Sequence, residues 1–186
     1  MAKEDWSVPL GLIILDGKEI GPGLSEHELA AIEDYWAFRF PPDLREMLQV
    51  ALPLMPPFPD WRGYRTSQVC DLMEWPVDGI CYDVEHDDFW LDAWGRRPLA
   101  LEDAITVAKA NLKLAPKLIP IYGHRYLPAE PCESGNPVFS VYQTDVIYYG
   151  ANLRDYILTE FGDLSWEQAV AKVSKRIPFW ADLADS

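Results

Sequence analysis

The sequence predicts an α+β fold, in which a single domain packs helices against a central and mainly antiparallel sheet. Helical spacings of apolar residues occur near both ends of the chain, whereas β-branched and aromatic residues concentrate between residues 115 and 150. Two of the sheet segments are separated only by Gln143 and Thr144, a connection that suits a hairpin. At 186 residues, 49% of them hydrophobic, the chain can bury one substantial core, so we expect one domain over residues 1–186.

The first predicted helix covers residues 23–36. Ser25 can cap its first turn, and Glu28 can return the hydrogen bond. Glu33 stands at the margin of the expected buried stripe, which consists of Leu29, Ile32 and Trp36. If that carboxylate is buried it needs a partner, and the candidates are Arg39, Arg45 and Arg125. Glu33 is therefore predicted to form a fold-specifying ion pair, with the anchoring of a ligand as the alternative.

A second helix is predicted over residues 40–53, because Pro41 and Pro42 suit a helix entrance and Pro53 ends it. The following segment, residues 53–65, contains four prolines and is predicted to be an ordered loop. Aromatic side chains are expected to attach this loop to the core through Phe58 and Trp61.

The middle of the chain is predicted to continue with a short helix over residues 66–75 and a strand over residues 79–84. The strand is inferred because apolar side chains occupy alternate positions, at Ile80, Tyr82 and Val84. An amphipathic helix is predicted over residues 101–114, and Pro116 prevents its continuation.

The last third of the chain supplies the sheet and two further helices. Strands are predicted over residues 118–122, 138–142 and 145–149, from their β-branched and aromatic content. Helices are then predicted over residues 153–161 and 165–175, the latter capped by Ser165.

The chain is strongly acidic, with 16 Lys and Arg against 30 Asp and Glu and a formal net charge of −14. A field of that sign repels phosphate backbones, so binding of nucleic acid is not expected. The same field would attract a basic protein partner and speed its encounter. Acidity that only keeps the protein soluble is the alternative.

The sequence gives no sign of a membrane segment or of a disulfide framework. The apolar stretch near the N-terminus is short and is flanked by acidic residues, which suits neither a signal peptide nor a membrane span. The three cysteines, Cys70, Cys81 and Cys132, are far apart and suit a reducing compartment. A cytoplasmic location is expected.

His124, Arg125 and Tyr126 form the first candidate for partner binding, because an Arg beside aromatic rings has the composition of a binding hot spot. The alternative is a structural turn in which His124 is a hydrogen-bonded core residue and Arg125 pairs with a carboxylate such as Asp145.

An acidic stretch that follows the predicted strand is the second candidate. Strand alternation would place Asp83, Glu85 and Asp87 on one face, beside His86 and Asp88. Such a face could receive a basic partner or a divalent cation. The glycine of a calcium-binding loop is absent, so a solvated strand end is favoured over a metal site.

Tryptophan and arginine side chains interleave in the third candidate, which comprises Trp61, Trp75, Trp90 and Trp94 with Arg62, Arg96 and Arg97. Stacking of Arg on Trp could build a ligand pocket, but an interior seam is favoured. Trp94 is the exception, because it stands beside a glycine and Arg96 at a turn.

Motifs of nucleophilic, phosphate-binding or metal-dependent enzymes are absent from the sequence. We therefore predict no catalytic residues, no cofactor and no bound metal. A hydrolase that uses His124 with Asp145 and Tyr126 as an acid and base set is kept as a minor alternative.

Five segments of the chain resemble the SUKH superfamily, in particular its Smi/Knr-like family. They are GLSEHELAAIE at 23–33, FPPDLREML at 40–48, FWLDAWGRRP at 89–98, PKLIPIYGHRYLP at 116–128 and GNPVFSVYQTDVIYYG at 135–150. The resemblance implies an α+β fold with a central antiparallel sheet and a protein that binds other proteins. Bacterial members look like immunity proteins that neutralise polymorphic toxins, often nucleases, whereas fungal relatives regulate cell-wall synthesis and signalling.

The sequence thus favours a non-enzymatic protein that binds a basic toxin domain, with a regulatory or scaffold protein that binds a host factor as the alternative. Its candidate partner-binding residues are Glu33, Asp83, Glu85, Trp94, Arg96, His124, Arg125, Tyr126 and Asp145.

Overall fold

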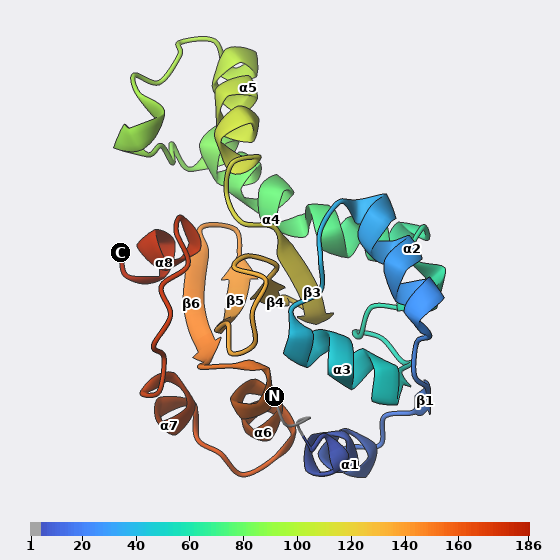
Figure 1. Cartoon of the computed structure of the whole chain (residues 1–186). Helices are drawn as coiled ribbons and strands as arrows, with labels where there is room; N and C mark the ends of the chain where they lie inside the picture. Colours follow the sequence, from blue (N-terminus) through green and yellow to red (C-terminus); the bar gives the residue numbers. More distant parts are fainter. Residues whose placement is uncertain (1–4) are drawn as a thin grey trace.

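A four-stranded antiparallel sheet lies at the centre of the computed structural model, which describes residues 5–186 (Figure 1). Its spatial order is β3–β4–β5–β6, with bounds of Leu118–Tyr122, Arg125–Pro128, Val138–Tyr142 and Asp145–Gly150. A separate two-stranded ribbon pairs β1 (Ile20–Pro22) with β2 (Ala51–Pro53). The prediction of an α+β fold with an antiparallel sheet is confirmed.

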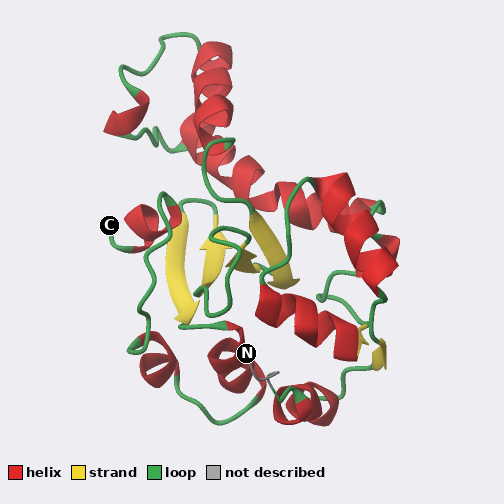
Figure 2. Cartoon of the chain, in the orientation of Figure 1, coloured by secondary structure: helices red, strands yellow, loops and turns green. Residues whose placement is uncertain are grey.

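Helices surround this sheet on several sides, as Figure 2 shows. The α-helices are α1 (Ser7–Leu15), α2 (Glu26–Trp36), α3 (Pro42–Val50), α4 (Ser67–His86), α5 (Leu101–Leu112), α6 (Leu153–Phe161), α7 (Trp166–Val170) and α8 (Trp180–Ala184). Short 3-10 turns are η1 (Trp61–Gly63) and η2 (Asp92–Trp94).

The two predicted helices near the N-terminus are confirmed, together with the loop that follows them, but the second helix ends at Val50 and residues 51–53 form strand β2 instead. In the capping box of α2, Ser25 accepts a hydrogen bond from the Glu28 amide, and the Glu28 carboxylate accepts one from the Ser25 amide at 2.8 Å. α3 begins at Pro42 as expected. In the loop, Trp61 is 1% exposed and packs edge-on against Phe40, at 5.3 Å between ring centroids.

The prediction of a strand over residues 79–84 is wrong, because these residues belong to the 20-residue helix α4. Ile80 and Val84 are both fully buried, and they are one helical turn apart as well as being on the same face of a strand. Tyr82, which strand alternation would bury with them, is 48% exposed. The spacing of Ile80 and Val84 therefore fits a helix as well as a strand, and the alternation at Tyr82 favoured the strand.

Pro76 is tolerated inside α4 because the sheet replaces the hydrogen bond that proline cannot make. Without an amide hydrogen, Pro76 leaves the Leu72 carbonyl without its helical donor. The Tyr126 hydroxyl of β4 donates to that carbonyl at 2.8 Å. Burial of this side chain also raises the pKa of Tyr126. A buried tyrosine thus joins the helix to the sheet at the proline.

We expect Tyr126→Phe to lower the free energy of unfolding by about 1–2 kcal/mol, because the Leu72 carbonyl loses its donor. Urea denaturation of the two proteins measures the difference. Tyr142→Phe, at a ring that is 53% exposed, is the control and should change stability by less than about 0.5 kcal/mol. Adding Pro76→Ala to Tyr126→Phe should recover part of the loss. Equal stability of the unsubstituted chain and the Tyr126→Phe variant would contradict this account.

The structure contains elements that the sequence did not predict. Helix α1 and strand β4 were missed, and β4 includes Arg125 and Tyr126, which were interpreted as a turn. The predicted helix over residues 165–175 is shorter, because α7 ends at Val170 although its cap at Ser165 is as expected. The remaining predicted strands and the helices α5 and α6 are confirmed.

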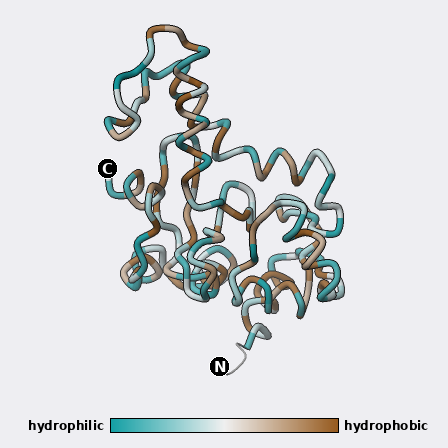
Figure 3. Tube along the Cα trace, turned by 45° about the horizontal axis from the view of Figure 1, so that its top comes forward, coloured by the Kyte–Doolittle hydropathy of each residue, from teal (hydrophilic) through white to brown (hydrophobic). Residues whose placement is uncertain are grey.

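A projecting part of the molecule, here called the α4–α5 arm, comprises residues 67–112. Its distal part, formed by the end of α4, the loop and α5, extends away from the sheet in Figures 1 and 3. The arm holds a small apolar cluster of its own, in which Val84, Ala104 and Ala108 are buried against Phe89 and Trp94. The two larger clusters lie on the two faces of the sheet, and one of them also includes Ile80, Cys81 and Leu112 of the arm.

Candidate protein-binding surface

One face of α4 carries a row of exposed rings. Trp75, Gly79, Tyr82 and His86 are spaced by four, three and four residues, which places them on one side of the helix. Trp75 is 43% exposed and Tyr82 is 48% exposed. The Tyr82 and His86 rings stack, with centroids 4.1 Å apart. The row is interrupted only at Gly79, where another element reaches the helix.

The turn of the β5–β6 hairpin packs on α4 at this glycine. A Cβ at Gly79 would lie 3.0 Å from Gln143 Cα, so a side chain there would push the hairpin away. The buried Asp83 carboxylate accepts hydrogen bonds from the Thr144 amide at 2.9 Å and from its hydroxyl at 2.6 Å. These contacts fix the position of the hairpin against the row of rings.

The hairpin adds further aromatic groups beside Trp75. Trp75 Nε1 donates to the Val141 carbonyl at 3.1 Å, and the Trp75 and Tyr142 rings are 5.9 Å apart. The exposed His124 ring lies 6.4 Å from that of Tyr142. Partial burial, with a smaller effect from the Arg125 charge, lowers the pKa of His124. We call this the α4–hairpin surface, formed by Trp75, Tyr82, Glu85, His86, His124, Tyr142 and Asp145.

The α4–α5 arm, which carries part of the α4–hairpin surface, is rich in acidic side chains. Residues 67–112 contain ten Asp and Glu against three Lys and Arg, and all ten except Asp83 are exposed. Asp71, Asp78 and Glu85 repeat every seven residues, which places them in a stripe beside the row of rings. The arm thus combines a high density of negative charge with exposed aromatic area.

Three of the predicted candidates belong to this surface: Glu85, His124 and Asp145. Asp83 lies directly beneath it but is only 4% exposed, so its role is to hold the hairpin and not to contact a partner. The predicted alternation of Asp83, Glu85 and Asp87 on one strand face is wrong, because all three follow a helical or turn geometry in which Asp83 points inward.

Arg125 and Tyr126 are the first two residues of β4, the former partly and the latter fully buried. Arg125 pairs with a carboxylate, as the structural alternative expected, but that carboxylate is Glu160 and not Asp145. Arg125 Nε lies 3.8 Å from Glu160 Oε2, and the guanidinium donates to Ser140 Oγ at 3.0 Å. The guanidinium also stacks over the Tyr149 ring at 3.9 Å. Burial raises the pKa of Glu160, an effect that Arg125 partly offsets. Both predicted candidates therefore support the sheet and are not available for partner contact.

Glu33 forms the predicted fold-specifying ion pair. It is 6% exposed and contacts Arg39 at 3.4 Å and Arg45 at 3.5 Å. It also accepts a hydrogen bond from the Phe40 amide at 3.0 Å, which links the end of α2 to the start of α3. Arg125, the third partner that the sequence suggested, takes no part.

The tryptophans do not form one continuous seam. Trp61 lies in the main core, whereas Trp90 and Trp94 pack edge-on in the arm with centroids 5.2 Å apart. Arg97 donates to the Val84 carbonyl at 2.6 Å and pairs with Asp88 at 2.8 Å. Arg96 is exposed and forms no hydrogen bond or ion pair with any other residue of the described chain. Trp94 is thus a partly buried residue of the arm and not the wall of a stacked pocket.

Neither a metal-binding cluster nor a membrane span is found in residues 5–186. Within this range no three His, Cys, Asp or Glu side chains converge in a way that could hold a metal ion. No helix of the same range combines the length and the apolar character needed to cross a bilayer.

Sequence reasoning missed Trp75, Tyr82 and Tyr142 as members of the surface. The spacing of Trp75, Tyr82 and His86 would have indicated a common helical face if α4 had been predicted to continue beyond Trp75. Tyr142 was assigned correctly to its strand, but its position beside Trp75 depends on tertiary packing.

In comparisons with known proteins, no family model, no curated protein and no solved structure matches this chain.

Proposed function

We propose that this chain is a non-enzymatic protein-binding protein of SUKH type, and that it acts as a cytoplasmic immunity protein against a toxin domain with a basic surface. One observation carries the proposal. The α4–α5 arm exposes nine carboxylates, and those of Asp71, Asp78 and Glu85 form a stripe beside the partly exposed rings of Trp75 and Tyr82. The five sequence segments that resemble the SUKH superfamily support the same assignment.

The surface suits the recognition of a basic protein for two physical reasons. Clustered carboxylates steer a positively charged partner and raise its association rate. Rigid aromatic rings, which lose little conformational entropy on contact, supply the anchors that make a complex last. A nuclease toxin has to present a basic surface to its phosphate-bearing substrate, so it is the partner class that this surface fits best.

Co-expression with a candidate toxin tests the function directly. We expect the chain to rescue growth from a basic toxin that is encoded beside it, and to retain that toxin in a pull-down at low salt more strongly than at high salt. Failure to rescue growth from the adjacent toxin would argue against the immunity role. Retention of a different host protein, with no effect on the toxin, would favour the regulatory alternative.

Neutralising the acidic stripe should weaken binding. We expect the triple variant Asp71→Asn, Asp78→Asn, Glu85→Gln to reduce affinity for the partner by about 30-fold, mainly through slower association. The matched control is Glu19→Gln, Glu130→Gln, Asp163→Asn, which changes the net charge equally at exposed positions outside the arm. Surface plasmon resonance at two salt concentrations compares them, and equal effects of both triples would refute a localised site.

A further inference from the structure

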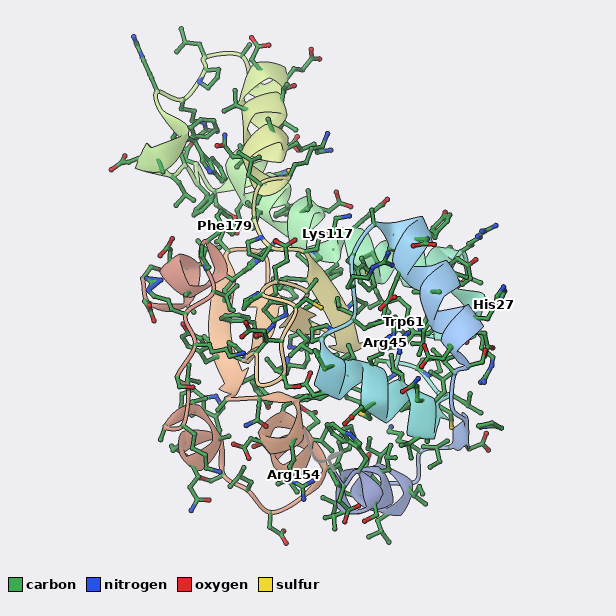
Figure 4. The ribbon with its side chains drawn as sticks, in the orientation of Figure 1. His27, Arg45, Trp61, Lys117, Arg154 and Phe179 are labelled. Carbon is green, nitrogen blue, oxygen red and sulfur yellow. The ribbon has the colours of Figure 1, made fainter. Side chains whose placement is uncertain are left out.

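An apolar cavity of about 480 Å³ lies where the α4–α5 arm joins the body of the molecule. Parts of α2, α4, α5, β3 and α8 line it. Its apolar wall is formed mainly by Trp36, Met73, Val77, Leu112, Leu118 and Trp180. Figure 4 labels Lys117 and Phe179 on this side of the body, at the base of the arm. The volume is within the range of cavities that hold small organic ligands.

Basic residues outnumber acidic ones around this cavity, whereas acidic residues outnumber basic ones in the whole chain. Three lysines, Lys109, Lys113 and Lys117, line it with only two acidic residues, Glu74 and Asp78. In the complete sequence, acidic residues outnumber basic ones by 30 to 16. A positive rim on an apolar cavity is thus a local exception in an acidic protein.

The lysines of this rim differ in what they contact. Lys117 Nζ donates to the Trp36 carbonyl at 2.6 Å and to the Ala37 carbonyl at 3.1 Å, so it ties the α5–β3 connection to the end of α2. The side chains of Lys109 and Lys113 are exposed, and their ammonium groups form no hydrogen bond or ion pair within residues 5–186. They are four residues apart at the end of α5, where helical geometry places them on one side.

We propose that this cavity binds an apolar ligand that carries a single carboxylate, of which a medium-chain alkyl carboxylate is the simplest form. The alkyl chain lies against the apolar wall, and the carboxylate is bound at the rim by Lys109 and Lys113. Glu74 and Asp78, on the α4 wall, disfavour a second negative charge and keep the ligand a monoanion. This site shares only Asp78 with the acidic stripe beside the α4–hairpin surface, and it does not depend on the proposed immunity function.

Calorimetric titration of the full chain with sodium laurate, below its micellar concentration, tests the proposal. We expect one binding site, with affinity that increases about fourfold per added CH₂ from octanoate to laurate. Dodecanol and dodecylammonium, which have the same chain without the carboxylate, should bind at least fivefold more weakly.

Two sets of variants separate the contributions of the rim and the wall. Lys109→Ala with Lys113→Ala should weaken laurate at least fivefold and leave dodecanol unchanged, whereas Arg96→Ala, at another unpaired cation, should change neither. Val77→Trp, which fills the cavity from α4, should abolish the binding of both ligands, and circular dichroism verifies that each variant is folded. The absence of laurate binding, equal affinity for laurate and dodecylammonium, or no effect of the lysine substitutions would overturn the proposal.

Discussion

Trp61→Ala is expected to lower the free energy of unfolding by about 3–5 kcal/mol. The indole is 1% exposed and lies between the helices and the sheet (Figure 4). Phe38 and Phe40 pack edge-on against it. Truncation removes a large buried ring and leaves a cavity that these aromatic neighbours cannot fill without leaving their own contacts. Urea denaturation followed by far-ultraviolet circular dichroism measures the loss.

Trp166→Ala is the matched control for this loss. Trp166 is 43% exposed, and its Nε1 donates to the Tyr148 carbonyl at 2.9 Å. Its removal should cost only about 1 kcal/mol, the usual contribution of one hydrogen bond. If both variants lost equal stability, the loop that carries Trp61 would not be part of the main core.

The Trp61 loop also illustrates what can be predicted from the sequence. Four prolines disfavour a long helix or strand there, and two large aromatic residues in such a segment lower their free energy by joining the core. The cap of α2 is equally local, because Ser25 and Glu28 are three residues apart and require nothing from the rest of the chain. The attachment of the Trp61 loop to the core and the cap of α2 were therefore predicted correctly, because they depend only on burial and on residues close in sequence.

Helix α4 shows why other features could not be predicted. Pro76 disfavours a continuous helix unless another group satisfies the Leu72 carbonyl, and that group is Tyr126, which lies 54 residues after Leu72 in the chain. Strand β4 was missed for a similar reason, since Arg125 is stabilised in the sheet by Glu160 of α6, which is distant in sequence. Both errors concern polar groups whose partners are distant in sequence. The candidate surface was missed for the same reason, because it forms only where the complete helix α4 packs against the β5–β6 hairpin.

Asp83→Ala is expected to lower the free energy of unfolding by about 3 kcal/mol and also to weaken partner binding. Asp83 Oδ2 accepts both hydrogen bonds from Thr144, and bonds to an ionised acceptor contribute about 1.5–3 kcal/mol each. Asp83→Asn, which keeps one acceptor oxygen, should recover about half of the loss. Thermal and urea denaturation measure stability, and surface plasmon resonance measures affinity for the partner.

Comparison with Glu85→Ala distinguishes a residue that holds the hairpin in place, Asp83, from a residue expected to contact the partner, Glu85. Glu85 is exposed on the same helix and its carboxylate has no hydrogen bond or ion pair to another described residue, so its removal should change stability by less than about 0.5 kcal/mol. Because it belongs to the acidic stripe, Glu85→Ala should nevertheless slow association with the partner. Asp83→Ala should instead leave the association rate nearly unchanged and speed dissociation, since it displaces the hairpin that carries Tyr142 and Asp145. A common effect of both variants on association alone would mean that Asp83 acts through its charge and that the hairpin does not contribute to the surface.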